Sequence, residues 1–214
     1  AQVVDKMEGF LNVAKGEIDR LDYIVSQFLQ AIRPTEPALK PVSLNDVVID
    51  TLSLLRPELE NRGIRVEEKL SRPLPAAPLD PGQLKQVLVN LIKNAMQVMT
   101  RSGVLTLETG EGLDGVWVSV GDTGTGISPE KLNRVFEPFF TTKEVGEGSG
   151  LGLSMVHGFV RQSQGHVSVY SEVGVGTTVK WYFKATPDVQ VTQASVCDMD
   201  PPTAHANETV LVVE

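Results

Sequence analysis

Three short stretches of the sequence carry residue types that suit phosphate or metal binding. "GEGSGLGLS" (146–154) is dense in glycine and precedes an expected helix, so its backbone N–H groups could attract a phosphate. "NLIKNA" places Asn90 and Asn94 one helical turn apart, where two amide oxygens could hold Mg²⁺ or orient phosphates. "GDTGTGIS" (121–128) places Asp122 just beyond an expected strand, where its carboxylate could accept a hydrogen bond from an exocyclic amine. Taken singly, each stretch also fits a turn, a cap or a surface position.

The elements that would position these residues are readable from local signals. Ser43 and Asp46 resemble a capping box at the start of a helix that runs to about Asn61. Asp80 is an expected N-cap, because Pro81 follows it, and its helix should run to about Thr100. Helices of this kind mixed with mainly antiparallel strands predict a two-layer α/β sandwich of α+β type. The expected strands are "IRVEEKL", "VLTLETG", "GVWVSVG", "HVSVYSE" and "TTVKWYF", and further helices should begin after Ser128 and Gly150.

Residues 1–33 show a heptad pattern, with apolar residues spaced alternately by three and four. Phe10, Ile24 and Leu29 widen the apolar stripe, which favours a helical bundle over a narrow two-stranded seam. We therefore expect a long amphipathic helix that either pairs with a partner helix or packs on its own domain. The heptad positions are Val4, Met7, Leu11, Ala14, Ile18, Leu21, Val25, Phe28 and Ile32.

The composition excludes several classes of protein. The chain has 214 residues, 41% of them hydrophobic, and a formal net charge of −8, which makes it a poor binder of nucleic acid. Its one cysteine, Cys197, rules out a disulfide framework. No apolar run approaches the ~20 residues that a membrane helix needs. We expect a cytoplasmic location for this part, whether or not a parent protein is membrane-anchored.

The order of the motifs is more informative than any one of them. Paired asparagines, Asp-x-Gly-x-Gly, "FEPFFTTK", "GEGSGLGLS" and "VGVGTT" (173–178) follow one another along the chain. They resemble the N box, first glycine box, F box, second glycine box and glycine-threonine motif of the ATP-binding catalytic domain of sensor histidine kinases. The resemblance covers residues 42–185 and implies the histidine-kinase/gyrase-type ATPase fold. It also implies ATP and Mg²⁺ as cofactors.

The resemblance implies roles for the residues singled out above. Asp122 would bind the adenine amino group, and Gly124 and Gly126 would let the base approach closely. Asn94, together with Asn90, would coordinate Mg²⁺ and the triphosphate, so these two residues are the expected metal ligands.

The resemblance also implies a mobile lid from about Ile127 to Gly150. Lys143 would supply a phosphate-binding cation, while Phe136, Phe139 and Phe140 either anchor the lid or belong to the core. Ser149 stands where threonine is commoner in the family. The further residues placed at the nucleotide are Ile127, Phe140, Gly148, Ser149, Gly150, Leu151 and Gly152, with Thr178 supporting the adenine side.

The phosphoacceptor histidine of the family has no counterpart in this sequence. His157, His166 and His205 all lack the His-Glu context that such an acceptor requires. The resemblance then implies a homodimer through the N-terminal helix, a histidine-bearing helix as phosphate acceptor and a response regulator as partner. The expected organisation has five parts. Residues 1–34 are the second helix of the dimerisation domain, residues 35–41 are a linker and residues 42–186 are the catalytic domain. Residues 187–207 are a second linker, and residues 208–214 are a truncated, receiver-like strand.

Two alternatives to a kinase domain remain open. Gyrase-type ATPases need a glutamate base where this chain has Asn90, so efficient hydrolysis of ATP is not expected. A nucleotide-binding and dimerisation module without kinase activity is the other alternative.

Gln97 stands at a position where many family members have a lysine or arginine that contacts phosphate. Lys143 or Arg134 would have to compensate for the missing charge.

Overall fold

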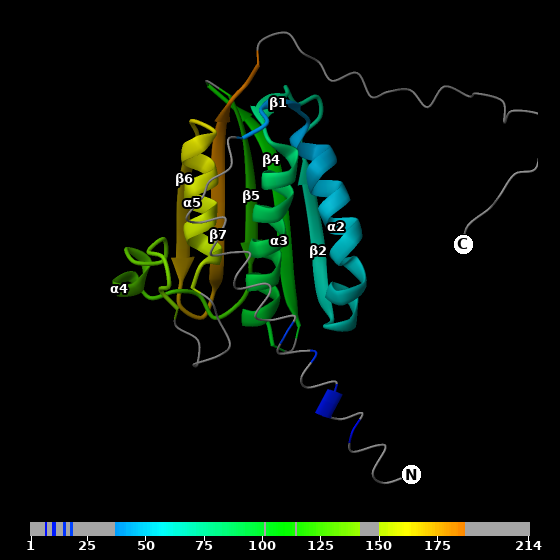
Figure 1. Ribbon diagram of the computed structural model, residues 1–214, viewed down its shortest axis with the longest axis vertical. Coiled ribbons are helices and arrows are strands. Elements are labelled where there is room, and N and C mark those ends of the chain that lie inside the picture. Colours follow the sequence, from blue (N-terminus) through cyan, green and yellow to red (C-terminus); the bar gives the residue numbers. More distant parts are fainter. Residues whose placement is uncertain are drawn as a thin grey trace, which may run out of the picture.

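The architecture is a five-stranded sheet covered on one face by helices α2, α3 and α5 (Figure 1). The computed structural model describes residues 37–100, 102–113, 115–141 and 150–186, together with Met7, Phe10, Leu11, Lys15 and Ile18. The strands lie in the order β2–β4–β5–β7–β6, which confirms the predicted two-layer α/β arrangement. The bounds are α2 Leu44–Asn61, β2 Ile64–Leu70, α3 Pro81–Val98, β4 Gly103–Gly112, β5 Gly115–Asp122, α4 Pro129–Leu132, α5 Gly152–Gln162, β6 His166–Glu172 and β7 Gly176–Lys184.

The two long helices begin at the predicted caps. The Ser43 side chain accepts a hydrogen bond from the backbone N–H of Asp46 at 3.3 Å. Asp80 Oδ1 accepts from the N–H groups of Gly82 at 2.9 Å and Gln83 at 3.1 Å. Each cap satisfies backbone donors that have no partner within the first helical turn, so both starting points are fixed by the sequence.

A small second sheet was not predicted. β1 (Lys40–Val42) pairs antiparallel with β3 (Ala77–Leu79), so part of the expected linker 35–41 is a strand. Pro41 lies opposite Pro78 in this pair. Prolines cannot donate to a ladder and are tolerated at sheet edges, so a proline-rich stretch can still pair.

Three of the four strand pairs in the main sheet are antiparallel, as expected, but β2 pairs with β4 in parallel. The core lies between the sheet and the helices. Alternate strand residues face it, and it includes Trp181, which is 0% exposed. Burying a large apolar side chain contributes about 1.5–3 kcal/mol, so this layer supplies most of the stability. Other fully buried members are Leu44, Leu52, Leu59, Leu79, Leu84, Leu88, Ile92, Met96, Leu105, Leu107 and Leu151.

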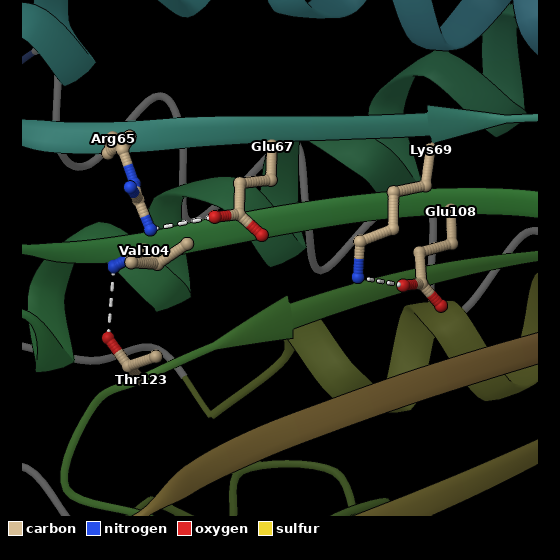
Figure 2. Close-up of polar contacts among 6 residues, drawn as sticks. All are labelled: Arg65, Glu67, Lys69, Val104, Glu108 and Thr123. Carbon is tan, nitrogen blue, oxygen red and sulfur yellow. Dashed lines mark hydrogen bonds and ion pairs between the residues drawn. The ribbon is translucent and has the colours of Figure 1, made fainter.

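The opposite face of the sheet carries polar side chains. On β2 and β4, Arg65 pairs with Glu67 at 2.7 Å and Lys69 pairs with Glu108 at 2.8 Å (Figure 2). The hydrogen bond to Glu108 raises the pKa of the exposed Lys69 ammonium. Exposed pairs of this kind add little to the stability of the fold.

Little of the predicted N-terminal helix can be compared with the structure. Met7, Phe10, Leu11, Lys15 and Ile18 are helical and exposed. The rest of residues 1–33 lies outside the described residues, as do the predicted linker 187–207 and strand 208–214. In the described parts of the chain, the structure has no helix with the length and apolar character needed to cross a membrane.

Candidate functional site

Asp122 is the last residue of β5 and lies half-buried at the end of the sheet. Its Oδ1 accepts a hydrogen bond from the backbone N–H of Gly124 at 2.8 Å. Burial raises the pKa of the Asp122 carboxyl above its ordinary value of 3.8, and backbone hydrogen bonds from Gly124 and Thr177 partly offset this rise. The carboxylate is therefore held in one orientation in a partly desolvated position, where a hydrogen-bond donor would find a fixed acceptor.

The turn after Asp122 interlocks with the hairpin between β6 and β7. Gly126 has φ +68°, and a Cβ there would collide with the carbonyl oxygen of Glu172. Gly176 has φ +142°, and a Cβ there would collide with the carbonyl oxygen of Asp122. Both positions therefore require glycine for conformation and for space. Gly126, a predicted site residue, thus allows the turn after Asp122 to pack against the backbone of Glu172 beside the Asp122 carboxylate.

Thr123 links the turn after Asp122 to the neighbouring strand β4 by a hydrogen bond. Its Oγ1 accepts a hydrogen bond from the backbone N–H of Val104 at 2.9 Å (Figure 2). It also lies 3.8 Å from the sulfur of Met99, the C-cap of α3. The end of β5 is thus tied to both the start of β4 and the end of α3, which leaves Asp122 little freedom to move.

Thr177, and not the predicted Thr178, is the threonine beside Asp122. Asp122 and Thr177 are direct partners in the β5–β7 ladder. Thr178 is exposed and lies on the outer face, where a Cβ on Gly121 would come within 3.1 Å of its Oγ1. Because successive strand residues point to opposite faces, the two threonines cannot share a role. The structure therefore places Thr177, which was not predicted, and not the predicted Thr178 on the face of the sheet that carries Asp122.

One face of α3 contacts both glycine stretches. Asn90, Asn94 and Val98 follow at intervals of four residues, which places them along one helix face. A Cβ on Gly152 would lie 3.4 Å from Asn94 Nδ2, and a Cβ on Gly124 would collide with Val98. The predicted asparagines, the start of α5 and the turn after Asp122 are therefore brought to the same end of the molecule. This is the end at which α4 lies in Figure 1.

The donor set at this end suits a hard cation held jointly with a ligand. Asn90 is buried and Asn94 is half-buried. Among the described residues there is no cluster of three histidine, cysteine, aspartate or glutamate side chains that could form a metal site unaided. Amide oxygens are acceptable Mg²⁺ ligands, but Mg²⁺ usually also keeps waters or takes phosphate oxygens. The two asparagines therefore fit a metal that arrives with a phosphate ligand.

The segment after Ile127 contains the aromatic residues of "FEPFFTTK". Phe136 stacks on His157 of α5 with ring centroids 5.3 Å apart, so it attaches this segment to α5. Arg134 lies 4.6 Å above the Phe140 ring and also pairs with Glu137. Phe139 is 60% exposed and so is not a core residue.

The beginning of α5 is shaped by two glycines. Gly150 has φ +66°, and a Cβ there would collide with the Phe139 backbone, so this glycine allows the two backbones to meet. Leu151 is the buried N-cap residue and Gly152 the first residue of α5. Lys143, Gly148 and Ser149, also predicted site residues, lie outside the described residues.

Comparison with known proteins places this geometry in a family. The family described as "Histidine kinase-, DNA gyrase B-, and HSP90-like ATPase" matches residues 79–187. The sensor histidine kinase ZraS of Escherichia coli K12 is 40% identical over 162 residues, which is 76% of this chain and 34% of ZraS. The sensor kinase CckA of Brucella abortus is 39% identical over 181 residues, covering 78% of this chain and 19% of CckA. The chain thus spans about a third or less of the length of these relatives.

Solved structures of similar proteins have the same fold. Full-length ShkA in complex with AMPPNP superimposes with a TM-score of 0.73 at 29% identity, covering 84% of this chain and 39% of ShkA. The histidine kinase ThkA in complex with the response regulator protein TrrA gives a TM-score of 0.70 at 23% identity, covering 83% of this chain and 51% of ThkA. At that identity the second likeness concerns the fold alone.

Proposed function

Because the chain belongs to the histidine kinase-, DNA gyrase B- and HSP90-like ATPase family, we propose that it is the ATP-binding catalytic part of a sensor histidine kinase. In the intact kinase it transfers the γ-phosphate of ATP to a histidine on a separate helix. The observation that carries the proposal is the contact of one face of α3 with both glycine stretches. That contact gathers a fixed carboxylate, two amide side chains and a helix N-terminus at one end of the sheet.

The proposed binding mode assigns one part of ATP to each group. Asp122 accepts a hydrogen bond from the adenine amino group, and Thr177 lies beside it on β7. The N–H groups at the start of α5 face the phosphates, since a helix N-terminus attracts anions. Asn90 and Asn94 supply amide oxygens to Mg²⁺, which neutralises the phosphate charge when bound. Lys143, Gly148 and Ser149 remain proposed phosphate contacts.

The residues of this site favour transfer to a histidine over hydrolysis. Asn90 has an amide where an ATPase of the gyrase type needs a carboxylate, and an amide cannot take a proton from water. Catalysis would rest on positioning and on electrostatic stabilisation of the transferred phosphoryl group. The full-length ShkA structure contains AMPPNP, which supports ATP as the ligand proposed for this chain.

The proposed partners follow from the family. We propose that the heptad helix of residues 1–34 joins a homodimer, that the acceptor histidine lies on the paired helix and that a response regulator receives the phosphate. Because phosphoryl transfer needs ATP, we also propose that this part of the protein lies in the cytoplasm.

Phosphoryl transfer to a supplied acceptor tests the proposal. The chain is incubated with Mg²⁺, ATP labelled at the γ-phosphate and the separately purified histidine-bearing domain of a relative such as ZraS. Kinase activity predicts acid-labile, base-stable label on the acceptor domain, and none when its histidine is replaced by glutamine. ATP binding without transfer to acceptor domains from several relatives would instead support the nucleotide-binding and dimerisation module.

A further inference from the structure

Ser171, near the end of β6, has three hydrogen-bond partners for its single hydroxyl: one in the turn after β5 and two in β7. Its Oγ accepts a hydrogen bond from the backbone N–H of Ile127 at 2.8 Å. It lies 3.0 Å from the carbonyl oxygen of Gly176 and 2.8 Å from Thr177 Oγ1. Ile127 is 44 positions away in the sequence and is the first residue of the proposed lid. This hydroxyl therefore joins the lid to the β6–β7 hairpin.

The direction of the three hydrogen bonds follows from the chemistry of a hydroxyl, which has one hydrogen and two lone pairs. A carbonyl oxygen can only accept, so the Ser171 hydrogen goes to Gly176. Thr177 must then donate its hydroxyl hydrogen to Ser171, because Ser171 has no second hydrogen to give. The backbone N–H of Ile127 donates to the remaining lone pair of Ser171 Oγ. The one hydrogen and both lone pairs of the Ser171 hydroxyl are thus used in bonds to the protein, so no water is needed to satisfy them.

The same residues connect Ser171 to the carboxylate of Asp122, which is proposed to bind the adenine base. Thr177 is the direct partner of Asp122 in the β5–β7 ladder, and both side chains lie on the helix-covered face of the sheet. A continuous chain of contacts therefore runs from Asp122 through Thr177 and Ser171 to Ile127. The carbonyl of Gly176, which Ser171 also holds, belongs to the glycine packed against the Asp122 backbone.

We propose that Ser171 is a positioning residue that fixes the first residue of the lid, Ile127, relative to the adenine-binding carboxylate of Asp122. Ser171 acts through Ile127 and Thr177 and does not itself touch the nucleotide. This inference rests on the proposed function, because it takes Ile127 as the start of the ATP lid that the resemblance to sensor histidine kinases implies. It predicts that loss of the hydroxyl impairs binding of the phosphates more than binding of the base.

The test uses the whole chain with three substitutions at Ser171 and one matched control. Ser171→Ala removes the hydroxyl, Ser171→Cys keeps its approximate shape but hydrogen-bonds weakly, and Ser171→Thr restores a hydroxyl. Ser168→Ala changes a serine of the same strand that is exposed on the outer face of the sheet. Two quantities are measured for each: the exchange rate of the Ile127 amide hydrogen without ligand, and the affinities for adenosine and for a non-hydrolysable ATP analogue with Mg²⁺.

The proposal expects Ser171→Ala and Ser171→Cys to speed exchange at Ile127 about tenfold and to weaken the ATP analogue about tenfold. Adenosine affinity should change less than about twofold, the size of effect expected where no hydrogen bond is lost. Ser171→Thr and Ser168→Ala should match the unsubstituted chain. If the threonine variant does not fold, the alanine and cysteine variants still decide the matter. Unchanged exchange at Ile127, or equal losses of affinity for adenosine and the ATP analogue, would overturn the proposal.

The outcome also separates this proposal from the proposed function. If the unsubstituted chain binds neither adenosine nor the ATP analogue, the proposed function fails whatever the variants do. If it binds both and the Ser171 variants bind them equally well, the assignment of Ser171 alone fails.

Discussion

Thr177 and Asp122 are direct partners where β7 pairs with β5, and the backbone of Thr177 lowers the pKa of the Asp122 carboxyl against the rise that burial causes. The side-chain hydroxyl of Thr177 hydrogen-bonds the hydroxyl of Ser171. The neighbouring Thr178 belongs to the opposite face of the sheet. One position along β7 therefore separates a residue of the proposed adenine site from a residue of the outer surface.

Replacing each threonine by valine tests this difference. Thr177→Val keeps the shape of the side chain but removes the hydroxyl hydrogen donated to Ser171. A neutral hydrogen bond contributes about 1 kcal/mol, so we expect roughly fivefold weaker binding of an ATP analogue. Thr178→Val should leave the affinity unchanged. Fluorescence titration with a labelled ATP analogue measures both, and a larger loss from Thr178→Val would return the role to that residue.

The raised pKa of Asp122 predicts a pH dependence of nucleotide binding. An ionised carboxylate accepts a stronger hydrogen bond from the adenine amine than a protonated one. Affinity should therefore fall as the pH falls through the raised pKa, which lies above the ordinary value of 3.8. Asp122→Asn should bind ATP far more weakly and without this pH dependence. Calorimetric titrations at a series of pH values would detect it, and identical pH profiles for the two proteins would argue against Asp122 as the acceptor.

The same shift has an opposite consequence for stability. Because the folded protein binds the Asp122 proton more tightly than the unfolded chain, the free energy of unfolding contributed by this group is highest below pH 3.8. It is lost as the pH rises through the raised pKa. Asp122→Asn should therefore lack this decrease, which urea unfolding across the same pH range would measure. A steeper decrease of the free energy of unfolding with rising pH in Asp122→Asn than in the unsubstituted chain would contradict this expectation.

Two glycines of α5 offer a matched comparison. A Cβ on Gly152 would lie 3.4 Å from Asn94 Nδ2, whereas a Cβ on Gly158 would meet nothing within 4 Å. Gly158→Ala should raise the free energy of unfolding by about 0.5–1 kcal/mol through helix propensity and leave nucleotide binding unchanged. Gly152→Ala should weaken the binding of Mg²⁺–ATP, because the added methyl group would lie against Asn94 at the start of α5, where the phosphates are proposed to bind. Unfolding curves and nucleotide titrations on both variants would check this, and equal affinities would exclude Gly152 from the site.

Asn94→Ala tests the proposed metal contact. Removing an amide oxygen from Mg²⁺ should weaken Mg²⁺–ATP about tenfold, equivalent to ~1.4 kcal/mol. Binding of ADP without metal should change much less. The two affinities are compared by titration in the presence of Mg²⁺ and of EDTA. Losses of similar size in both conditions would show that Asn94 contacts the nucleotide and not the metal.

Much of the fold was predictable because its signals are local. The caps Ser43 and Asp80 hydrogen-bond backbone groups within three residues, so the sequence around them is sufficient. The alternation of apolar residues likewise indicated the main strands. The pairing of Pro41 with Pro78 could not be foreseen, because it joins segments far apart in sequence and prolines usually mark loops.

The site was predictable in its residue types but not in its register. The paired asparagines, Asp122 and the glycine stretches of the proposed site were all predicted from their motifs. The structure places Thr177, one position before the predicted Thr178, beside Asp122, and counting the strand alternation back from the apolar Val179 indicates the same residue. The role of Ser171 depends on how the β6–β7 hairpin meets Ile127, a contact that no local pattern shows.

The most direct test of the central claim is calorimetric titration of the chain with a non-hydrolysable ATP analogue, with and without Mg²⁺. The account predicts saturable binding with one nucleotide per chain, tighter with Mg²⁺ than without, and loss of binding in Asp122→Asn. A folded chain that binds no nucleotide in the presence of Mg²⁺ would contradict it.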